Sequence, residues 1–241
     1  MQRKLIVTKD GSHSISVPEM NVTYHSVYGA IQESRHLYIE AGLKSIRPLQ
    51  AARCINIFEM GFGTGLNALL TLIEAEKQQL KIHYTAAEPY PLQPEEAAAL
   101  NYCDQLTRED LKPVFQQLHE GEWEKDIAIT PFFTLYKIKD NLVSLSTCLA
   151  GPNGLLWSRQ AYQHFNLIYF DAFAPAAQPE LWTREIFEKL FLMMKPGGIL
   201  VTYCSKGNVR RAMEAAGFKV EKIPGPKGKR EMIRAAHPKV I

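Results

Sequence analysis

The chain has 241 residues, of which 46% are apolar and 22% charged, a composition typical of a folded globular protein rather than a disordered or fibrous one. No segment reaches the run of about 20 apolar residues that a membrane-spanning helix needs, and residues 1–7 do not continue into the apolar core of a secretion signal. The 4 cysteines lie far apart without C-x-x-C spacing, so neither a metal site nor a disulfide framework is expected. These features predict a cytoplasmic protein without membrane association.

The net charge of +3 is unevenly distributed along the chain. From Lys206 to Ile241, ten Lys and Arg side chains stand against three Glu, whereas the rest of the chain is net negative. Such asymmetry fits a polyanionic partner on one face, and it fits a solvated basic surface equally well.

The first part of the chain predicts a small β-structure followed by a helix. Short alternating runs flank Asp10-Gly11, which is typical of a β-hairpin, and a helical segment over 31–40 ends at Gly42. We expect residues 1–45 to form an N-terminal β appendage with a lid segment, and residues 46–241 to form the main domain. Tyr28 and Glu33 would then reach the substrate from the lid, although a plain amphipathic helix explains the pattern as well.

Three glycines break an apolar strand at its end. The strand over 54–60 stops at Gly61, Gly63 and Gly65, and helix-forming residues resume at once, so the glycines occupy a strand-to-helix turn where a ligand can approach the main chain. The spacing E-x-G-x-G-x-G differs from the G-x-G-x-x-G of dinucleotide sites. The Glu59 carboxylate would repel a pyrophosphate but suits a cationic ligand. A tight turn without a ligand is the alternative.

Strands and helices alternate through the rest of the chain, which predicts a doubly wound, mostly parallel sheet. Strands are expected at 81–87, 130–138, 164–170, 199–204, 218–223 and near 231–235, with helices at 91–118, 183–194 and 208–216 and a turn at 195–198.

Acidic side chains follow three of these strands. Because the carboxyl ends of parallel strands meet at a ligand crevice, Glu88 is a candidate for binding ribose hydroxyls and Asp171 for lying beside the reacting atoms. Asp140 could accept from an adenine amino group, or could cap a helix beginning at Asn141. Phe173 and Trp182 offer surfaces on which a flat base could stack.

Several motifs agree in order and place with one family. They are E-M-G-F-G-T-G-L-N, A-E-P-Y-P-L, F-D-A-F-A-P-A-x-x-P-E-L-W, K-P-G-G-I-L-V-T-Y, V-R-R-A-M-E-A-A-G-F and K-G-K-R-E-M. From about Tyr24 to Ala235 the chain resembles the methyltransferase domain of MnmC. The resemblance implies a Rossmann-like fold with an antiparallel C-terminal strand, S-adenosyl-L-methionine (SAM) as cofactor, and methylation of 5-aminomethyl-2-thiouridine at the tRNA wobble position.

The resemblance also implies roles for individual residues. Asp171 would orient the acceptor amine, Glu88 would bind the ribose and Asp140 the adenine. Further cofactor contacts would come from Glu59, Gly61, Phe62, Gly63, Gly65 and Asn67. Substrate contacts would come from Tyr28, Glu33, Phe173, Arg210, Lys227, Lys229 and Arg230, with the basic side chains on tRNA phosphates.

One expectation about domain organisation and two alternative functions accompany this interpretation. The chain stops at Ile241 without the FAD-dependent oxidoreductase domain of bifunctional relatives, so we expect a standalone, monomeric enzyme whose aminomethyl substrate is supplied by upstream enzymes. An aminopropyltransferase would use a similar sheet but would be expected to need a more acidic pocket for a polyamine. A non-catalytic SAM-binding RNA module would have no need of the Asp171 loop.

Overall fold

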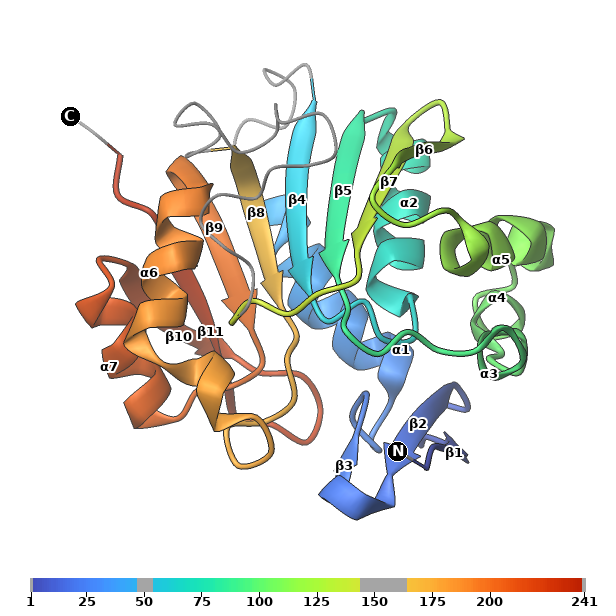
Figure 1. Cartoon of the computed structure of the whole chain (residues 1–241), viewed down its shortest axis with the longest axis horizontal. Coiled ribbons are helices and arrows are strands. Elements are labelled where there is room, and N and C mark those ends of the chain that lie inside the picture. The colour runs from blue at the N-terminus through green and yellow to red at the C-terminus, as the bar shows by residue number, and fades with distance from the viewer. Residues whose placement is uncertain (1, 47–53, 144–163, 240–241) are drawn as a thin grey trace.

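An eight-stranded sheet runs through the centre of the computed structural model, which describes residues 2–46, 54–143 and 164–239 (Figure 1). The strand order is β10-β11-β9-β8-β4-β5-β7-β6. The strands are β4 Ile55–Met60, β5 Ile82–Ala87, β6 Asp126–Thr130, β7 Phe133–Ile138, β8 Phe165–Phe170, β9 Met194–Thr202, β10 Lys219–Pro224 and β11 Glu231–Ala236. Neighbouring strands from β9 to β7 are parallel, whereas β11 is antiparallel to β9. The predicted mostly parallel sheet with an antiparallel C-terminal strand is confirmed.

A second, three-stranded antiparallel sheet lies below the carboxyl ends of β4 and β5 in Figure 1. It contains β1 Lys4–Val7, β2 His13–Val17 and β3 Val22–Thr23, and a short 3-10 helix η1, Pro18–Met20, joins the last two. The predicted hairpin around Asp10-Gly11 is confirmed, and the small N-terminal β appendage is present. The division of the chain at residue 45 stays a prediction.

Helices cover both faces of the large sheet, and alternate strand residues separate two apolar cores. On one face lie α1 Ala30–Ser34, the π-helix η2 Arg35–Glu40, α2 Leu66–Gln78 and α5 Lys112–Glu120; on the other lie α6 Arg184–Met193 and α7 Gly207–Ala215. Ile57 packs in the first core and its neighbour Phe58 in the second, both fully buried. This alternation follows from the two-residue period of a strand.

The helix predicted over 91–118 is wrong in detail. The structure has α3 Pro94–Ala98, α4 Tyr102–Gln105, the 3-10 turn η5 Glu109–Leu111 and then α5. Helical backbone cannot continue through Thr107, which has a φ of 54°, or Arg108, with φ −131°. The strand predicted over 130–138 is present as β7, which begins only at Phe133, and Thr130 instead ends the additional strand β6, which pairs antiparallel with β7.

The turn predicted at 195–198 lies inside β9, where the pairing with β8 shifts register and Gly197 takes a φ of +81°. The helix expected from Asn141 does not form over residues 141–143, where the chain makes a turn at Leu142 and Val143. The rest of the expected helix lies outside the described residues. Two further 3-10 turns are η3 Leu43–Ser45 and η6 Pro179–Trp182. Within the described ranges, no helix combines the length and apolarity that crossing a bilayer would need.

Candidate active site

Three adjacent parallel strands end at the same level and place their next residues side by side. Met60 of β4 is in register with Ala87 of β5 and with Phe170 of β8. The residues that follow are Gly61, Glu88 and Asp171, and the ladder continues through them, since Gly61 N donates to Ala87 O and Asp171 N to Met60 O. Sheet register alone therefore brings the glycine turn and the two carboxylates together.

The glycine turn packs so closely against its neighbours that side chains do not fit there. Gly61 has a φ of +90°, and a Cβ on it would lie 2.9 Å from the Asp171 carbonyl oxygen. Gly63 has a φ of +52°, and a Cβ there would lie 2.9 Å from Cδ1 of Tyr24. Both positions require glycine for conformation and for space, as expected of a backbone that a ligand approaches closely.

A cavity of about 240 Å³ opens at this turn. Six of the predicted site residues line it, namely Gly61, Phe62, Gly63, Glu88, Asp171 and Phe173. The structure thus brings together part of the residues assigned to the cofactor with the residue assigned to the acceptor. The lining also includes Tyr24, His25, Tyr90 and Gln178.

Glu59 and Asn67 lie behind the cavity wall rather than on it. The Asn67 amide nitrogen donates both to Glu59 Oε1, at 2.8 Å, and to Asp171 Oδ2, at 2.9 Å. Glu59 is completely buried, which raises the pKa of its carboxyl well above the ordinary value. In this arrangement Glu59 orients Asn67, and Asn67 orients Asp171. Gly65 begins α2 and also does not line the cavity.

Glu88 accepts two backbone hydrogen bonds at the cavity edge. Its Oε2 accepts from Gly63 N at 2.9 Å and its Oε1 from Tyr90 N at 2.8 Å. Burial raises the pKa of the Glu88 carboxyl, while these two N–H groups and the Arg3 charge lower it. The carboxylate therefore fixes the glycine turn and still faces the cavity, where ligand hydroxyls could donate to its remaining lone pairs.

Asp171 is the partly buried acid at the centre of the site. Burial raises the pKa of its carboxyl to about 6, and the nearby Glu33 charge adds to the rise. The hydrogen bond from Asn67, the nearby Tyr38 hydroxyl and the positive charge of Lys229 act in the opposite direction. The group is thus ionised at neutral pH but close to its titration range.

The sequence reasoning did not single out Tyr24 and His25, which cover the cavity from the N-terminal segment. The Tyr24 ring packs on Gly63 and meets Phe173 edge-on, with ring centroids 5.1 Å apart. Burial and the Glu88 charge raise the pKa of Tyr24 to about 12. His25 Nε2 lies 2.6 Å from the Thr64 hydroxyl oxygen of the glycine turn. Their position just before the predicted lid was the only available signal.

The other predicted residues are distributed around this centre. Asp140 follows β7 and accepts from Asn141 N, but it is not among the residues that line the cavity. Tyr28 is 41% exposed, and the ammonium of Lys9 lies 4.5 Å from its ring centroid. Glu33 is buried and forms an ion pair with Lys229.

Three basic residues predicted to contact substrate lie farther out. Lys227 and Arg230 are exposed in the loop between β10 and β11, and Arg210 on α7 forms an ion pair with Glu214. In the part of the chain that the structure describes, no group of His, Cys, Asp and Glu side chains could hold a metal ion.

Comparison with known proteins identifies related sequences and folds. Residues 114–238 match the sequence profile of a family described as S-adenosyl-L-methionine-dependent methyltransferase. The chain is 29% identical over 219 residues to the tRNA 5-methylaminomethyl-2-thiouridine biosynthesis bifunctional protein MnmC of Pseudomonas entomophila, covering 89% of this chain and 32% of that protein. It is 30% identical over 237 residues to MnmC of Aromatoleum aromaticum, covering 97% and 35%. The chain therefore spans about a third of the length of these relatives.

Two solved structures share the fold. MnmC2 from Aquifex aeolicus superposes with a TM-score of 0.74 at 21% identity, covering 100% of this chain and 72% of that one. A spermidine synthase from Thermotoga maritima gives 0.60 at 13% identity, covering 99% and 70%. At these identities the likeness concerns the fold alone.

Proposed function

The chain belongs to the S-adenosyl-L-methionine-dependent methyltransferases, and from that membership we propose that it methylates the primary amine of 5-aminomethyl-2-thiouridine at the tRNA wobble position. The product would be 5-methylaminomethyl-2-thiouridine. The motif resemblance supports this substrate, as do the names of the MnmC relatives, which are tRNA 5-methylaminomethyl-2-thiouridine biosynthesis proteins. Upstream enzymes would supply the aminomethyl group, and the monomer would act in the cytoplasm.

One observation carries the proposal, namely that Gly61, Glu88 and Asp171 converge on a single cavity. SAM, when bound, supplies an electrophilic methyl group on a positively charged sulfur. The backbone at Gly61 and Gly63 would bind the methionine part, and the Glu88 carboxylate would accept from the ribose hydroxyls. We place the adenine toward Asp140, which follows the neighbouring strand β7.

Asp171 would act on the acceptor. Methyl transfer is an in-line displacement, so the amine must be unprotonated and its lone pair must point at the methyl carbon. An ionised Asp171 carboxylate can accept a hydrogen bond from the amine, hold it in line, and stabilise the positive charge that develops on nitrogen. Phe173 on the cavity wall would stack against the splayed-out wobble base.

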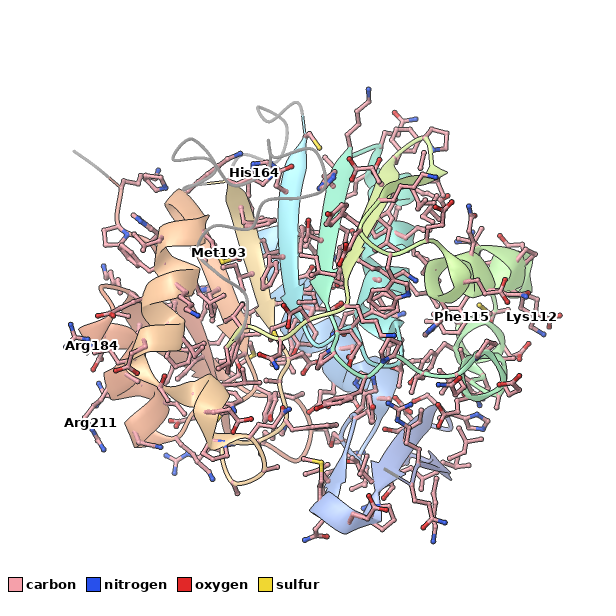
Figure 2. All side chains as sticks on the ribbon, in the orientation of Figure 1. Lys112, Phe115, His164, Arg184, Met193 and Arg211 are labelled. Carbon is pink, nitrogen blue, oxygen red and sulfur yellow. The ribbon has the colours of Figure 1, made fainter. Side chains whose placement is uncertain are left out.

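The tRNA backbone would contact the basic surface formed by Arg210, Arg211, Lys227 and Arg230. Lys227 and Arg230 are exposed in the loop between β10 and β11, and Arg211 extends from α7 away from the sheet (Figure 2). Each phosphate contact displaces condensed counterions, so tRNA binding should weaken steeply as salt rises.

A transfer assay tests the proposal. The protein is incubated with methyl-labelled SAM and tRNA from cells that lack this methylation, and nucleosides are analysed by mass spectrometry. Label in the wobble uridine is expected, and the matched control is an unmodified transcript of the same tRNA, which has no aminomethyl amine. Transfer only from decarboxylated SAM to putrescine would make the protein an aminopropyltransferase. Tight SAM binding without any transfer would make it a binding module.

A further inference from the structure

The basic loop between β10 and β11 closes onto the helical segment that precedes the glycine turn. His36 Nε2 on η2 lies 2.9 Å from the carbonyl oxygen of Pro224, where the loop begins. Gly228, with a φ of +90°, brings its main chain against the Tyr28 ring, so closely that a Cβ would clash. The loop therefore has a defined position against the N-terminal segment. One of its basic residues can face inward while others face solvent.

Lys229 is that inward residue. Its ammonium lies 2.6 Å from Glu33 Oε1 and 4.0 Å from the centroid of the Tyr203 ring. The Glu33 side chain is only 8% exposed, and its second oxygen accepts from Ser26 N at 2.7 Å. Because a buried carboxylate is stable only when paired and hydrogen-bonded, Lys229 is committed to this contact rather than free for a phosphate.

The pair reaches the proposed acceptor position through two contacts. The Tyr203 hydroxyl under Lys229 donates to the Ala172 carbonyl at 2.9 Å, on the residue next to Asp171. The charges of Glu33 and Lys229 also act on the pKa of Asp171 through space, Glu33 raising it and Lys229 lowering it. The pair thus adjoins the end of the cavity where Asp171 would hold an amine.

We propose that Glu33 and Lys229 are a positioning pair that holds the basic loop closed beside the acceptor end of the site, with the Lys229 charge offsetting the charge of the buried Glu33 at Asp171. This inference rests on the role proposed for Asp171. It assigns Lys229 to the pair with Glu33, and it leaves Lys227 and Arg230 as the loop residues for tRNA phosphates. A tRNA that engages the outer side of the loop would thereby stabilise the inner side in its closed position.

The sign of each contribution can be worked out. The titratable groups that face Asp171 are Glu33, Tyr38, Glu59, Tyr84, Tyr203 and Lys229. Lys229 is the cation among them, so removing it leaves Glu33 unpaired and makes ionisation of Asp171 harder. Removing the Glu33 charge leaves the cation and makes ionisation easier. Removing both charges should leave the pKa of Asp171 nearly unchanged, because their effects on it oppose each other.

The experiment is a carboxyl titration of the full-length protein by ¹³C NMR with labelled aspartate, in which the Asp171 signal is identified by its loss in Asp171→Asn. Lys229→Met is expected to raise the titration midpoint by about 0.5 unit or more, and Glu33→Gln to lower it by a similar amount. In the double variant Glu33→Gln with Lys229→Met, the Asp171 midpoint should lie close to the wild-type value. In Lys229→Arg the midpoint should stay at the wild-type value.

Midpoints that stay at the wild-type value in both single variants would overturn the pair's role. If Lys229→Met fails to fold, the other two variants decide whether the pair acts on Asp171. The midpoint should then be lowered in Glu33→Gln and close to the wild-type value in the double variant. The titration needs no substrate, so shifted midpoints in a protein that methylates no tRNA would refute the proposed function and leave the pair intact. With active enzyme, the acid limb of kcat/KM should move in the same directions as the midpoints.

Discussion

Replacing Gly63 with alanine places a methyl group where the glycine turn has no room. The residue has a φ of +52°, and the new Cβ would lie 2.9 Å from Cδ1 of Tyr24. Ordinary carbon–carbon contacts are about 3.5–4.0 Å, so the Tyr24 ring must move. That ring packs edge-on against Phe173 and forms part of the cavity lining, and its displacement reaches the space proposed for SAM.

The expected change in the free energy of unfolding follows from two destabilising contributions and one stabilising contribution. Left-handed backbone at a residue with a Cβ costs about 1–2 kcal/mol. Forcing a methyl group into a packed contact adds about 1–3 kcal/mol. Alanine recovers about 0.4–1 kcal/mol by restricting the unfolded chain. We expect the free energy of unfolding of Gly63→Ala to fall by about 1–4.5 kcal/mol. We expect its affinity for SAM to fall about tenfold or more, because about 1.4 kcal/mol corresponds to a factor of ten.

Urea denaturation measures the first quantity and isothermal titration calorimetry with SAM the second. The matched control is Gly207→Ala at the start of α7, where a Cβ would meet only the flexible end of Arg211, at 3.3 Å. The control should bind SAM as the wild type does. Wild-type SAM affinity in Gly63→Ala would refute the placement of the cofactor over the glycine turn.

The remaining predictions concern Asp171 and the basic loop. Asp171→Ala should nearly abolish methyl transfer while calorimetry shows SAM affinity largely unchanged; lost SAM binding would mean that the residue holds the cofactor instead. Burial raises the folded-state pKa of Asp171 from 3.8 to about 6, so the folded state holds this proton more tightly and its stability falls as pH rises through that window. Asp171→Asn should therefore be more stable than wild type at pH 7 in urea denaturation, and the difference should shrink as pH falls from about 6 to about 4; a difference independent of pH would exclude this titration. Lys227→Ala with Arg230→Ala should raise KM for tRNA and flatten its dependence on salt, whereas Lys77→Ala with Lys81→Ala, at the opposite edge of the sheet, should change neither.

Much of the site was predictable because it depends on local pattern and on sheet register. The apolar run before Gly61 defined β4, and the acids after two other apolar runs placed Glu88 and Asp171 at the same edge. Parallel strands that end together need no further information to make neighbours of these residues. The order of motifs then indicated the family.

The rest depended on contacts between distant segments, which periodicity does not encode. Tyr24 and His25 cover the glycine turn only because the N-terminal sheet folds beneath the carboxyl ends of the strands. Lys229 appeared as one of several basic residues in a glycine-rich loop, and nothing local indicated that it would turn inward to Glu33, far away in the sequence. The breaks in the segment 91–118 were also missed, although Pro113, which lies in the first turn of α5, excludes a helix that continues through it.

The most direct test of the account is a crystal structure of the protein with SAM bound. The account predicts the methionine part against the backbone of Gly61 and Gly63, the ribose hydroxyls on the Glu88 carboxylate, and the methyl carbon directed toward Asp171. A donor bound elsewhere, or one whose methyl group faces away from Asp171, would contradict it.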